Sequence, residues 1–220
     1  MSDHSRNMNM YFVSITVLPR KMGIDLPKCL LKIADIFSNP SHAINPVYGL
    51  KVCGEPKLIF IVRVADVAAI EHCVAEVFLQ AAAEVLCQPV ITYESFAQSI
   101  NVAESLAGPS GKRLAEDGLF WLEFHVGYQG KTTDQLIKIW KKEAEAVFTA
   151  RLKDEVSIEL YKSVAQRNVH AFINAPSPEY LDALSLKLPL MLLNGANVRL
   201  NCKAVQLLEN YISSVASNSV

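Results

Sequence analysis

The feature that most constrains how this chain can fold is a succession of strands and helices that occurs twice. In the first half, β-branched and aromatic runs and helically spaced apolar residues predict strands at 11–18, 47–52, 58–64 and 90–93, and helices at 26–37 and 67–83. In the second half, the same patterns predict strands at 119–126, 156–162, 169–173 and 197–202, helices at 132–151 and 178–187, and a terminal helix at 204–215. Both halves therefore have the order β-α-β-β-α-β.

Short stretches of similar sequence also recur between the halves. The stretch 30–33 (LLKI) precedes 136–139 (LIKI) by about as many positions as Phe60 precedes Phe172. A roughly constant offset predicts an internal duplication. Chance similarity between two common helix patterns is the alternative.

The order β-α-β-β-α-β is that of the ferredoxin-like unit, whose antiparallel sheet has helices on one face only. Two such units in one chain can cover each other's open sheet faces and edges. We therefore predict an α+β fold of two tandem ferredoxin-like repeats that pair as an internal dimeric α+β barrel. The predicted first repeat is 1–100, a linker with the breaker cluster 107–112 follows at 101–118, and the second repeat with its C-terminal helix is 119–220.

Charge and cysteine content exclude several classes of protein. The chain has 21 basic and 22 acidic residues, a balance that argues against nucleic-acid binding through phosphate contacts. Its five cysteines include no C-x-x-C pair, and neither a secretory leader nor an apolar run of membrane-spanning length is apparent. We expect a cytoplasmic protein with no nucleic-acid or membrane partner.

One face of the second predicted sheet is polar. Glu123 and His125 are two residues apart in one strand and point to the same side, and Tyr161, His170 and Arg199 lie on the same face of the other strands. Histidine exchanges a proton near neutral pH, and a neighbouring carboxylate orients it. We predict His125 as acid or base, Glu123 as the group that orients it, and Tyr161 or Arg199 as the stabiliser of developing charge. The alternative is an interface of ordinary ion pairs and hydrogen bonds.

Two imidazoles and two carboxylates on this face also suit a divalent metal. The residues of that alternative are His125, His170, Glu123 and Glu159. Their spacing does not establish convergence, so neither a metal nor a cofactor is predicted. Of the other histidines, His42 falls in a turn, and His72 falls on an apolar helix where a core or interface position is expected.

A hydrophobic pocket is predicted between the second sheet and its helices. Trp140 and Phe148 lie on the apolar face of the long helix 132–151, and Leu190 and Met191 belong to an unusually apolar connection. We predict that these four residues and His170 bind a small apolar molecule. Simple core packing is the alternative.

The second half resembles the muconolactone-isomerase family. The residues that carry the resemblance are Phe-His-Val at 124–126 in the opening strand, the long charged helix, LSLKLPL at 184–190 and NVRL at 197–200. The family's basic-aromatic cluster near its second strand is replaced here by KDEVSIE at 153–159. That departure favours the alternative of a barrel that has lost the family's active site.

The resemblance implies a ferredoxin-like unit that pairs into a dimeric α+β barrel and forms a homo-oligomer. It also implies a cofactor-independent isomerase or cyclase that acts on a small apolar carbonyl or lactone compound by proton transfer. The wider superfamily includes small monooxygenases and haem enzymes. The alternative function is a non-catalytic barrel that binds a small ligand or self-assembles.

Overall fold

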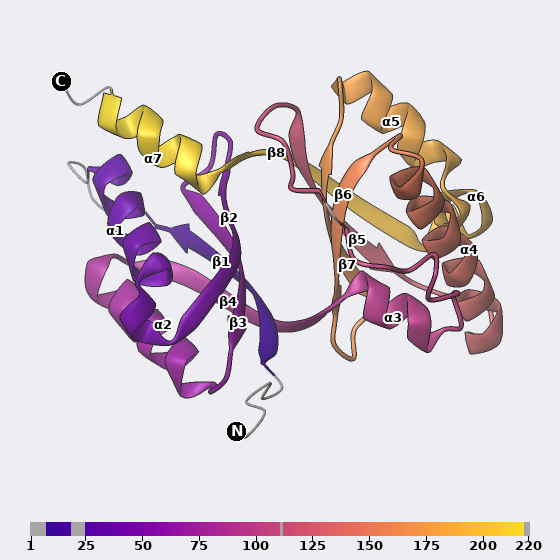
Figure 1. The fold of residues 1–220 in the computed structure, drawn as a ribbon, viewed down its shortest axis with the longest axis horizontal. Coiled ribbons are helices and arrows are strands. Elements are labelled where there is room, and N and C mark those ends of the chain that lie inside the picture. The colour runs from indigo at the N-terminus through magenta and orange to yellow at the C-terminus, as the bar shows by residue number, and fades with distance from the viewer. Residues whose placement is uncertain (1–7, 19–24, 111, 218–220) are drawn as a thin grey trace. The chain divides into compact units, whose positions relative to one another are not determined.

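The computed structural model describes residues 8–18, 25–110 and 112–217. Gly111, which belongs to the predicted breaker cluster, lies outside these ranges. The chain forms two compact units. Unit 1 contains the described residues up to Val90 and those from Val205 onward, and unit 2 contains Ile91–Ala204 (Figure 1).

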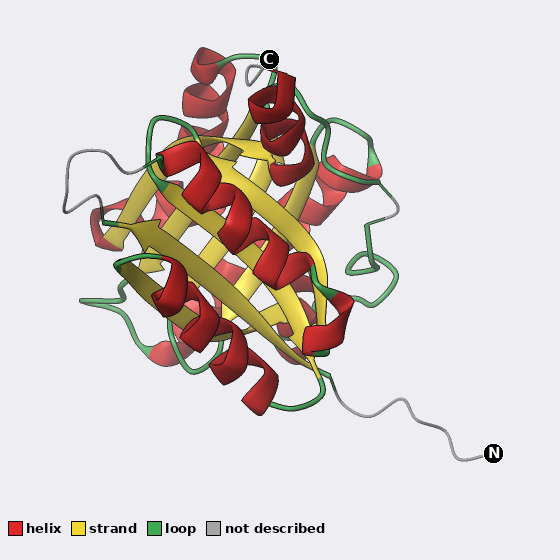
Figure 2. Ribbon diagram, turned by 90° about the vertical axis from the view of Figure 1, so that its left-hand side faces the viewer, coloured by secondary structure: helices red, strands yellow, loops and turns green. Residues whose placement is uncertain are grey.

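Unit 1 is a β-α-β-β-α-β unit. Its elements are β1 (Asn9–Val17), α1 (Leu26–Ser38), the 3-10 turn η1 (Pro40–His42), β2 (Ile44–Val52), β3 (Lys57–Val64), α2 (Ala68–Gln80) and β4 (Ala83–Thr92). Strand β1 pairs antiparallel with both β3 and β4, and β2 pairs with β3. Helices α1 and α2 lie on one face of this sheet (Figure 2), and the buried core of the unit fills the space between.

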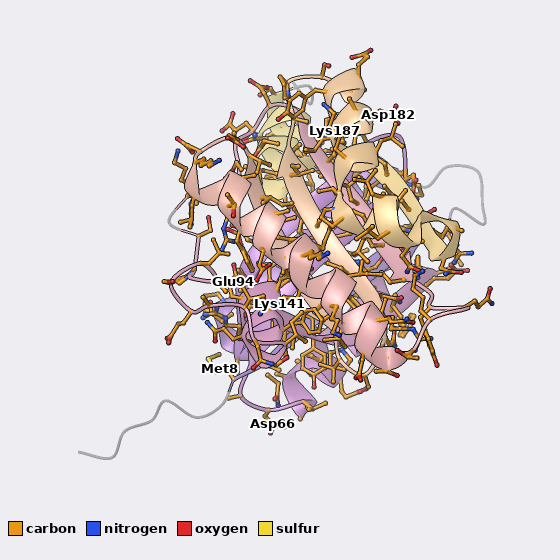
Figure 3. The ribbon with its side chains drawn as sticks, turned by 90° about the vertical axis from the view of Figure 1, so that its right-hand side faces the viewer. Met8, Asp66, Glu94, Lys141, Asp182 and Lys187 are labelled. Atoms are coloured by element: carbon orange, nitrogen blue, oxygen red, sulfur yellow. The ribbon has the colours of Figure 1, made fainter. Side chains whose placement is uncertain are left out.

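Unit 2 repeats this order after a short helix. Its elements are α3 (Tyr93–Ser99), β5 (Leu119–Val126), α4 (Thr133–Leu152), β6 (Ser157–Ser163), β7 (Asn168–Asn174), α5 (Pro178–Lys187), α6 (Pro189–Asn194), the 3-10 turn η2 (Gly195–Asn197) and β8 (Val198–Leu207). Strand β5 pairs antiparallel with β7 and β8, and β6 pairs with β7. Figure 3 views this unit from the side on which α4 and α5 lie in front of the sheet.

The predicted fold class is confirmed. The strand order is β1-β3-β2-β8-β5-β7-β6-β4, which is that of a closed antiparallel barrel. The last strand belongs to both units, because residues 205–207 at the end of β8 pair with Leu50–Val52 of β2. The last element that the structure describes is α7 (Leu208–Ser217), which belongs to unit 1.

Local sequence explains where the helices of unit 2 begin. Thr132 accepts a hydrogen bond from the Gln135 backbone, and the Gln135 side chain accepts one from the Thr132 backbone, which is a complete capping box at the start of α4. Ser177 caps α5 in the same position, and Pro178 occupies its first turn. The start of α4 fixes which of its residues face the sheet.

Several predicted boundaries are wrong. The strand predicted at 90–93 is β4, which begins seven residues earlier, at Ala83, and ends at Thr92. The helix predicted at 67–83 ends at Gln80, because β4 begins at Ala83 and pairs with β1 along its length. The last strand extends to Leu207 rather than 202, since its end is paired with β2, and the terminal helix begins only at Leu208. Helices α3 and α6 are short elements that the sequence analysis did not predict.

The segment predicted as a linker contains buried residues. Val102 and Ala107 are buried in the core of unit 2, and Gln98 donates a hydrogen bond to the Ala107 carbonyl at 3.1 Å. The repeat boundaries at 100 and 119 stay a prediction. Among the residues that the structure describes, every helix is too short or too polar to span a lipid bilayer.

Candidate functional site

A cavity of about 220 Å³ lies in unit 2, between the helix-facing side of the sheet and helices α4, α5 and α6. Its walls are mainly leucine, isoleucine, valine and alanine side chains. Five residues that line it carry polar groups: Tyr93, Trp140, Glu143, Ser185 and Lys187. A mostly apolar wall with a few polar groups is typical of a small-molecule site.

Glu143 is the buried carboxyl group of this cavity. It lies on α4 with only 4% of its surface exposed, and its Oε2 accepts a hydrogen bond of 2.9 Å from the Leu190 backbone N–H. Burial raises the pKa of Glu143 from 4.5 to about 7, and the bond from Leu190 opposes this shift. The carboxyl group therefore exchanges its proton near neutral pH.

Two aromatic residues flank the carboxyl group. Trp140 precedes Glu143 by three residues on α4, which places both on one helix face. Tyr93 is fully buried, and burial, followed by the nearby Glu143, raises the pKa of its hydroxyl. The Trp140 indole beside Tyr93 opposes this shift in the pKa, although its buried Nε1 makes no well-aligned hydrogen bond in the described ranges.

An ion pair joins α3 to the end of α4. The Arg151 guanidinium at the end of α4 lies 2.6 Å from Glu94 Oε1 on α3 and donates to the Gly108 carbonyl. Arg151 also stacks over the ring of Phe148, which is fully buried beside Tyr93. Helix α3 is thereby fixed against α4 on the side of Tyr93.

Two of the five predicted ligand-binding residues line the cavity, namely Trp140 and Leu190. Phe148 is a core residue behind the wall, and Met191 is the next residue of α6 after Leu190. His170 lies on the opposite face of the sheet, since its neighbours Val169 and Ala171 are the β7 residues that line the cavity. Their role in binding stays a prediction.

The predicted catalytic residues form a polar cluster on that opposite face. Glu123 pairs in register with His170 on β7 and Asn201 on β8, and His125 pairs in register with Arg199. His125 Nε2 lies 3.4 Å from Glu123 Oε2, and His125 Nδ1 lies 3.0 Å from Asn168 Oδ1. The expected contact between His125 and Glu123 is therefore present, although neither residue lines the cavity.

Tyr161 and His170 are the buried members of this cluster. Tyr161 on β6 pairs in register with His170, and the His170 ring stacks 6.0 Å from the ring of Trp121. Burial lowers the pKa of His170, with Glu123 opposing and His125 reinforcing the shift. His170 is therefore neutral near pH 7, whereas Arg199 is exposed at the surface of β8.

Glu159, the fourth residue of the alternative metal site, interacts with residues outside this cluster. Burial raises the pKa of Glu159 to about 7, and its interactions are with Ser110, Glu94 and Arg151. In the described part of the chain, no three ligand atoms of the four side chains proposed for that site converge within 4.8 Å. The metal alternative for this face is not supported.

The residues of the cavity do not fit a haem, the cofactor of some members of the superfamily. None of the lining residues is histidine, cysteine or methionine, which are common axial ligands of haem iron. Tyrosine also serves as a haem ligand, but the Tyr93 hydroxyl is fully buried with a raised pKa, which disfavours the phenolate.

Glu143 is the site residue that the sequence analysis missed. Trp140 and Phe148 mark the apolar face of α4 in the sequence, and Glu143 falls within the same stripe. A carboxylate inside an apolar helix face is the signal that identifies it, because ionisable groups are seldom buried without a partner.

Comparison with known proteins defines the fold. No family model and no curated protein matches the chain. A chlorite dismutase variant from Candidatus Nitrospira defluvii with one arginine replaced aligns over 96% of this chain and 95% of its own, with a TM-score of 0.57 and 10% identity. The same protein in complex with imidazole aligns over 96% and 95%, with a TM-score of 0.55 and 11% identity.

A third solved structure, provisionally named a chlorite dismutase, aligns over 91% of this chain and 95% of its own, with a TM-score of 0.57 and 14% identity. At such low identities the similarity establishes the fold alone. The dimeric α+β barrel fold that the sequence resemblance implied is therefore confirmed. The muconolactone-isomerase family itself stays a prediction.

Proposed function

We propose that the protein is a cofactor-independent enzyme that binds a small, mainly apolar carbonyl or lactone compound in the cavity of unit 2 and transfers a proton on it. The observation that carries this proposal is the buried Glu143 carboxyl group in an otherwise apolar wall, with a pKa of about 7. Proton transfer is most efficient when the pKa of the catalytic group lies near the working pH.

The surroundings of Glu143 supply the other requirements of such a reaction. The Leu190 N–H holds one carboxyl oxygen in place, and the second oxygen can take or give a proton. An indole N–H from Trp140, one helical turn away, can donate to a carbonyl oxygen on which negative charge develops. The apolar walls exclude water and select a substrate with little polar surface.

Solvent deuterium incorporation tests the reaction directly. Purified protein in heavy water is incubated with a simple butenolide and with cyclohex-3-enone, and exchange next to the carbonyl is followed by NMR. We expect Glu143→Gln to slow the exchange by about 100-fold or more, since this is the usual contribution of a general acid or base. Glu145→Gln, on the same helix but half-exposed, is the matched control.

The same experiment separates the alternative functions. Saturable binding of these compounds without deuterium exchange contradicts the enzyme and supports the non-catalytic ligand-binding barrel. Neither binding nor exchange, together with a defined oligomer in native mass spectrometry, supports the self-assembling barrel. The homo-oligomer remains a proposal that this mass measurement decides.

The polar cluster on the other sheet face is the second candidate site. The 3.4 Å contact of His125 with Glu123 and the neutral, buried His170 favour it. If this cluster carries the reaction, His125→Ala abolishes deuterium exchange while the far-UV circular dichroism spectrum is unchanged. Exchange that survives in this variant but is lost in Glu143→Gln assigns the chemistry to the cavity.

A further inference from the structure

Three side chains of unit 1 with metal-binding atoms converge at the surface of α2. His72 and Glu76 are four residues apart on this helix and therefore share one face, and His42 approaches from the turn η1. The nitrogen and oxygen atoms that these residues offer all lie within 4.8 Å of one another. Glu76 Oε1 lies 3.0 Å from His72 Nε2 and 3.3 Å from His42 Nε2.

These separations match those of ligands around one metal ion. Zinc binds imidazole nitrogen and carboxylate oxygen at about 2.0–2.2 Å in tetrahedral geometry, so neighbouring ligand atoms lie about 3.3 Å apart. Both distances to Glu76 Oε1 are close to this value. A single ion placed between the three atoms would contact each of them after small side-chain rotations.

The tautomer of His42 points to a cation at this position. His42 Nδ1 lies 2.8 Å from the Ile36 carbonyl oxygen, which only accepts hydrogen bonds, so Nδ1 carries the proton. In neutral His42 the lone pair of Nε2 then faces the Glu76 carboxylate oxygen. Two acceptors in this contact repel each other unless a proton or a metal ion lies between them.

The contact with Ile36 is also the arrangement that orients metal-binding histidines. Such residues usually donate their other ring N–H to a backbone carbonyl or carboxylate, which fixes the ring and strengthens the ligand. The side chain of His42 is only 10% exposed, whereas that of His72 is 63% exposed. One ligand is thus fixed by the fold, and the open side toward solvent leaves room for water.

We propose that His42, His72 and Glu76 bind a divalent transition metal ion of the zinc class. Two imidazoles and one carboxylate are a ligand set that suits zinc and cobalt. Cys73 is fully buried and its Sγ lies 3.6 Å from His42 Nδ1, on the side of the ring away from the ligand atom. The thiol is therefore outside the ligand set, and water completes the coordination.

Calorimetric titration of the metal-free full-length protein with zinc chloride tests the site. We expect one zinc ion per chain at the three residues and at least a tenfold weaker affinity in His72→Ala and in Glu76→Gln. Both side chains are partly exposed, so these variants leave the core of unit 1 intact. Glu71→Gln, exposed on the same helix, is the control that retains full affinity.

Cobalt substitution identifies the ligands. Visible absorption of cobalt bound to nitrogen and oxygen without a sulfur charge-transfer band is expected, and zinc should raise the melting temperature of the wild type but not of His72→Ala. Equal zinc affinity in the wild type and in both variants, or no zinc binding at all, overturns the proposal. A sulfur band that disappears in Cys73→Ser would contradict the proposed ligand set.

Discussion

At the residue scale, the chemistry of this protein depends on how far each ionisable group is buried. Burial shifts the pKa of three groups in the direction that favours the neutral form: Glu143, Glu159 and His170. Their partners differ, however. Glu143 contacts a backbone N–H and lines the cavity, whereas His170 lies near Glu123 and His125.

The raised pKa of Glu143 predicts a pH-dependent stability. Because folding raises this pKa from 4.5 to about 7, its contribution is complete below pH 4.5 and is lost as the pH rises through 7. Between pH 5 and pH 8 the loss for a buried carboxyl is about 2 kcal/mol. Urea unfolding at these two pH values should show that Glu143→Gln removes this part of the decrease in the free energy of unfolding between pH 5 and pH 8.

Burial also raises the pKa of Glu159, so the Glu143→Gln variant keeps the part of the pH dependence of stability that comes from Glu159. Glu145→Gln is the control and should leave the slope of the wild type unchanged. An identical slope in Glu143→Gln and in the wild type would show that the carboxyl group is ionised in the folded protein at pH 7.

The sequence predicts which residues of one strand are neighbours better than it predicts which residues become buried when separate elements pack together. Glu123 and His125 were placed on one face by the two-residue period of a strand, and the structure brings them into contact. Glu143 could be found only by treating a charged residue within an apolar stripe as buried. The meeting of His42 with His72 and Glu76 depends on the packing of a turn against a helix, which no local pattern encodes.

At the element scale, helix α4 determines the geometry of the cavity. It contributes Trp140 and Glu143 to the wall, and its capping box fixes the residue at which it begins. Predicted and observed bounds of this helix differ by one residue at each end, because the cap at Thr132 is a local signal. Strand β4 lacked such a signal, since its pairing with β1 is distant in sequence.

Loss of the cap should destabilise α4 without touching the cavity. Thr132→Ala removes the acceptor of the Gln135 backbone N–H, and an N-cap of this kind contributes about 1 kcal/mol. We expect a decrease of that size in the free energy of unfolding measured with urea. Thr133→Ala, at the exposed first position of the helix, should be near neutral, and equal effects of both variants would contradict the role of the cap.

At the scale of the whole molecule, each unit has its own hydrophobic core, yet unit 1 is built from two segments that the whole of unit 2 separates in sequence. The core of unit 1 includes Leu208, which follows the whole of unit 2 in sequence. A Cβ added at Gly49 would lie 2.9 Å from the Leu208 side chain, so α7 packs closely on β2. The sequence analysis predicted two consecutive repeats and not this return. The passage of β8 from unit 2 into unit 1 leaves no signal in the composition.

Leu208→Ala should therefore weaken the first unit. Removal of a buried leucine side chain costs about 2–5 kcal/mol. Both tryptophans, Trp121 and Trp140, lie in unit 2, so their fluorescence reports on that unit, whereas circular dichroism reports on both. We expect the urea midpoint from circular dichroism to fall more than the midpoint from fluorescence.

Equal shifts of the two midpoints would show that the units unfold as one cooperative body. Leu186→Ala, which removes an exposed leucine of α5, is the control and should leave both midpoints near their wild-type values.

The return of the chain to unit 1 has a consequence for biosynthesis. Residues up to Val90 leave the ribosome before unit 2, but Val205 and Leu208 are translated only after it. Until then the nascent first unit presents the end of β2 and the surface around Gly49 uncovered. Unit 2 is continuous in sequence and can complete its own core before Val205 and Leu208 are made, so unit 1 is translated earlier than unit 2 but completes its core later.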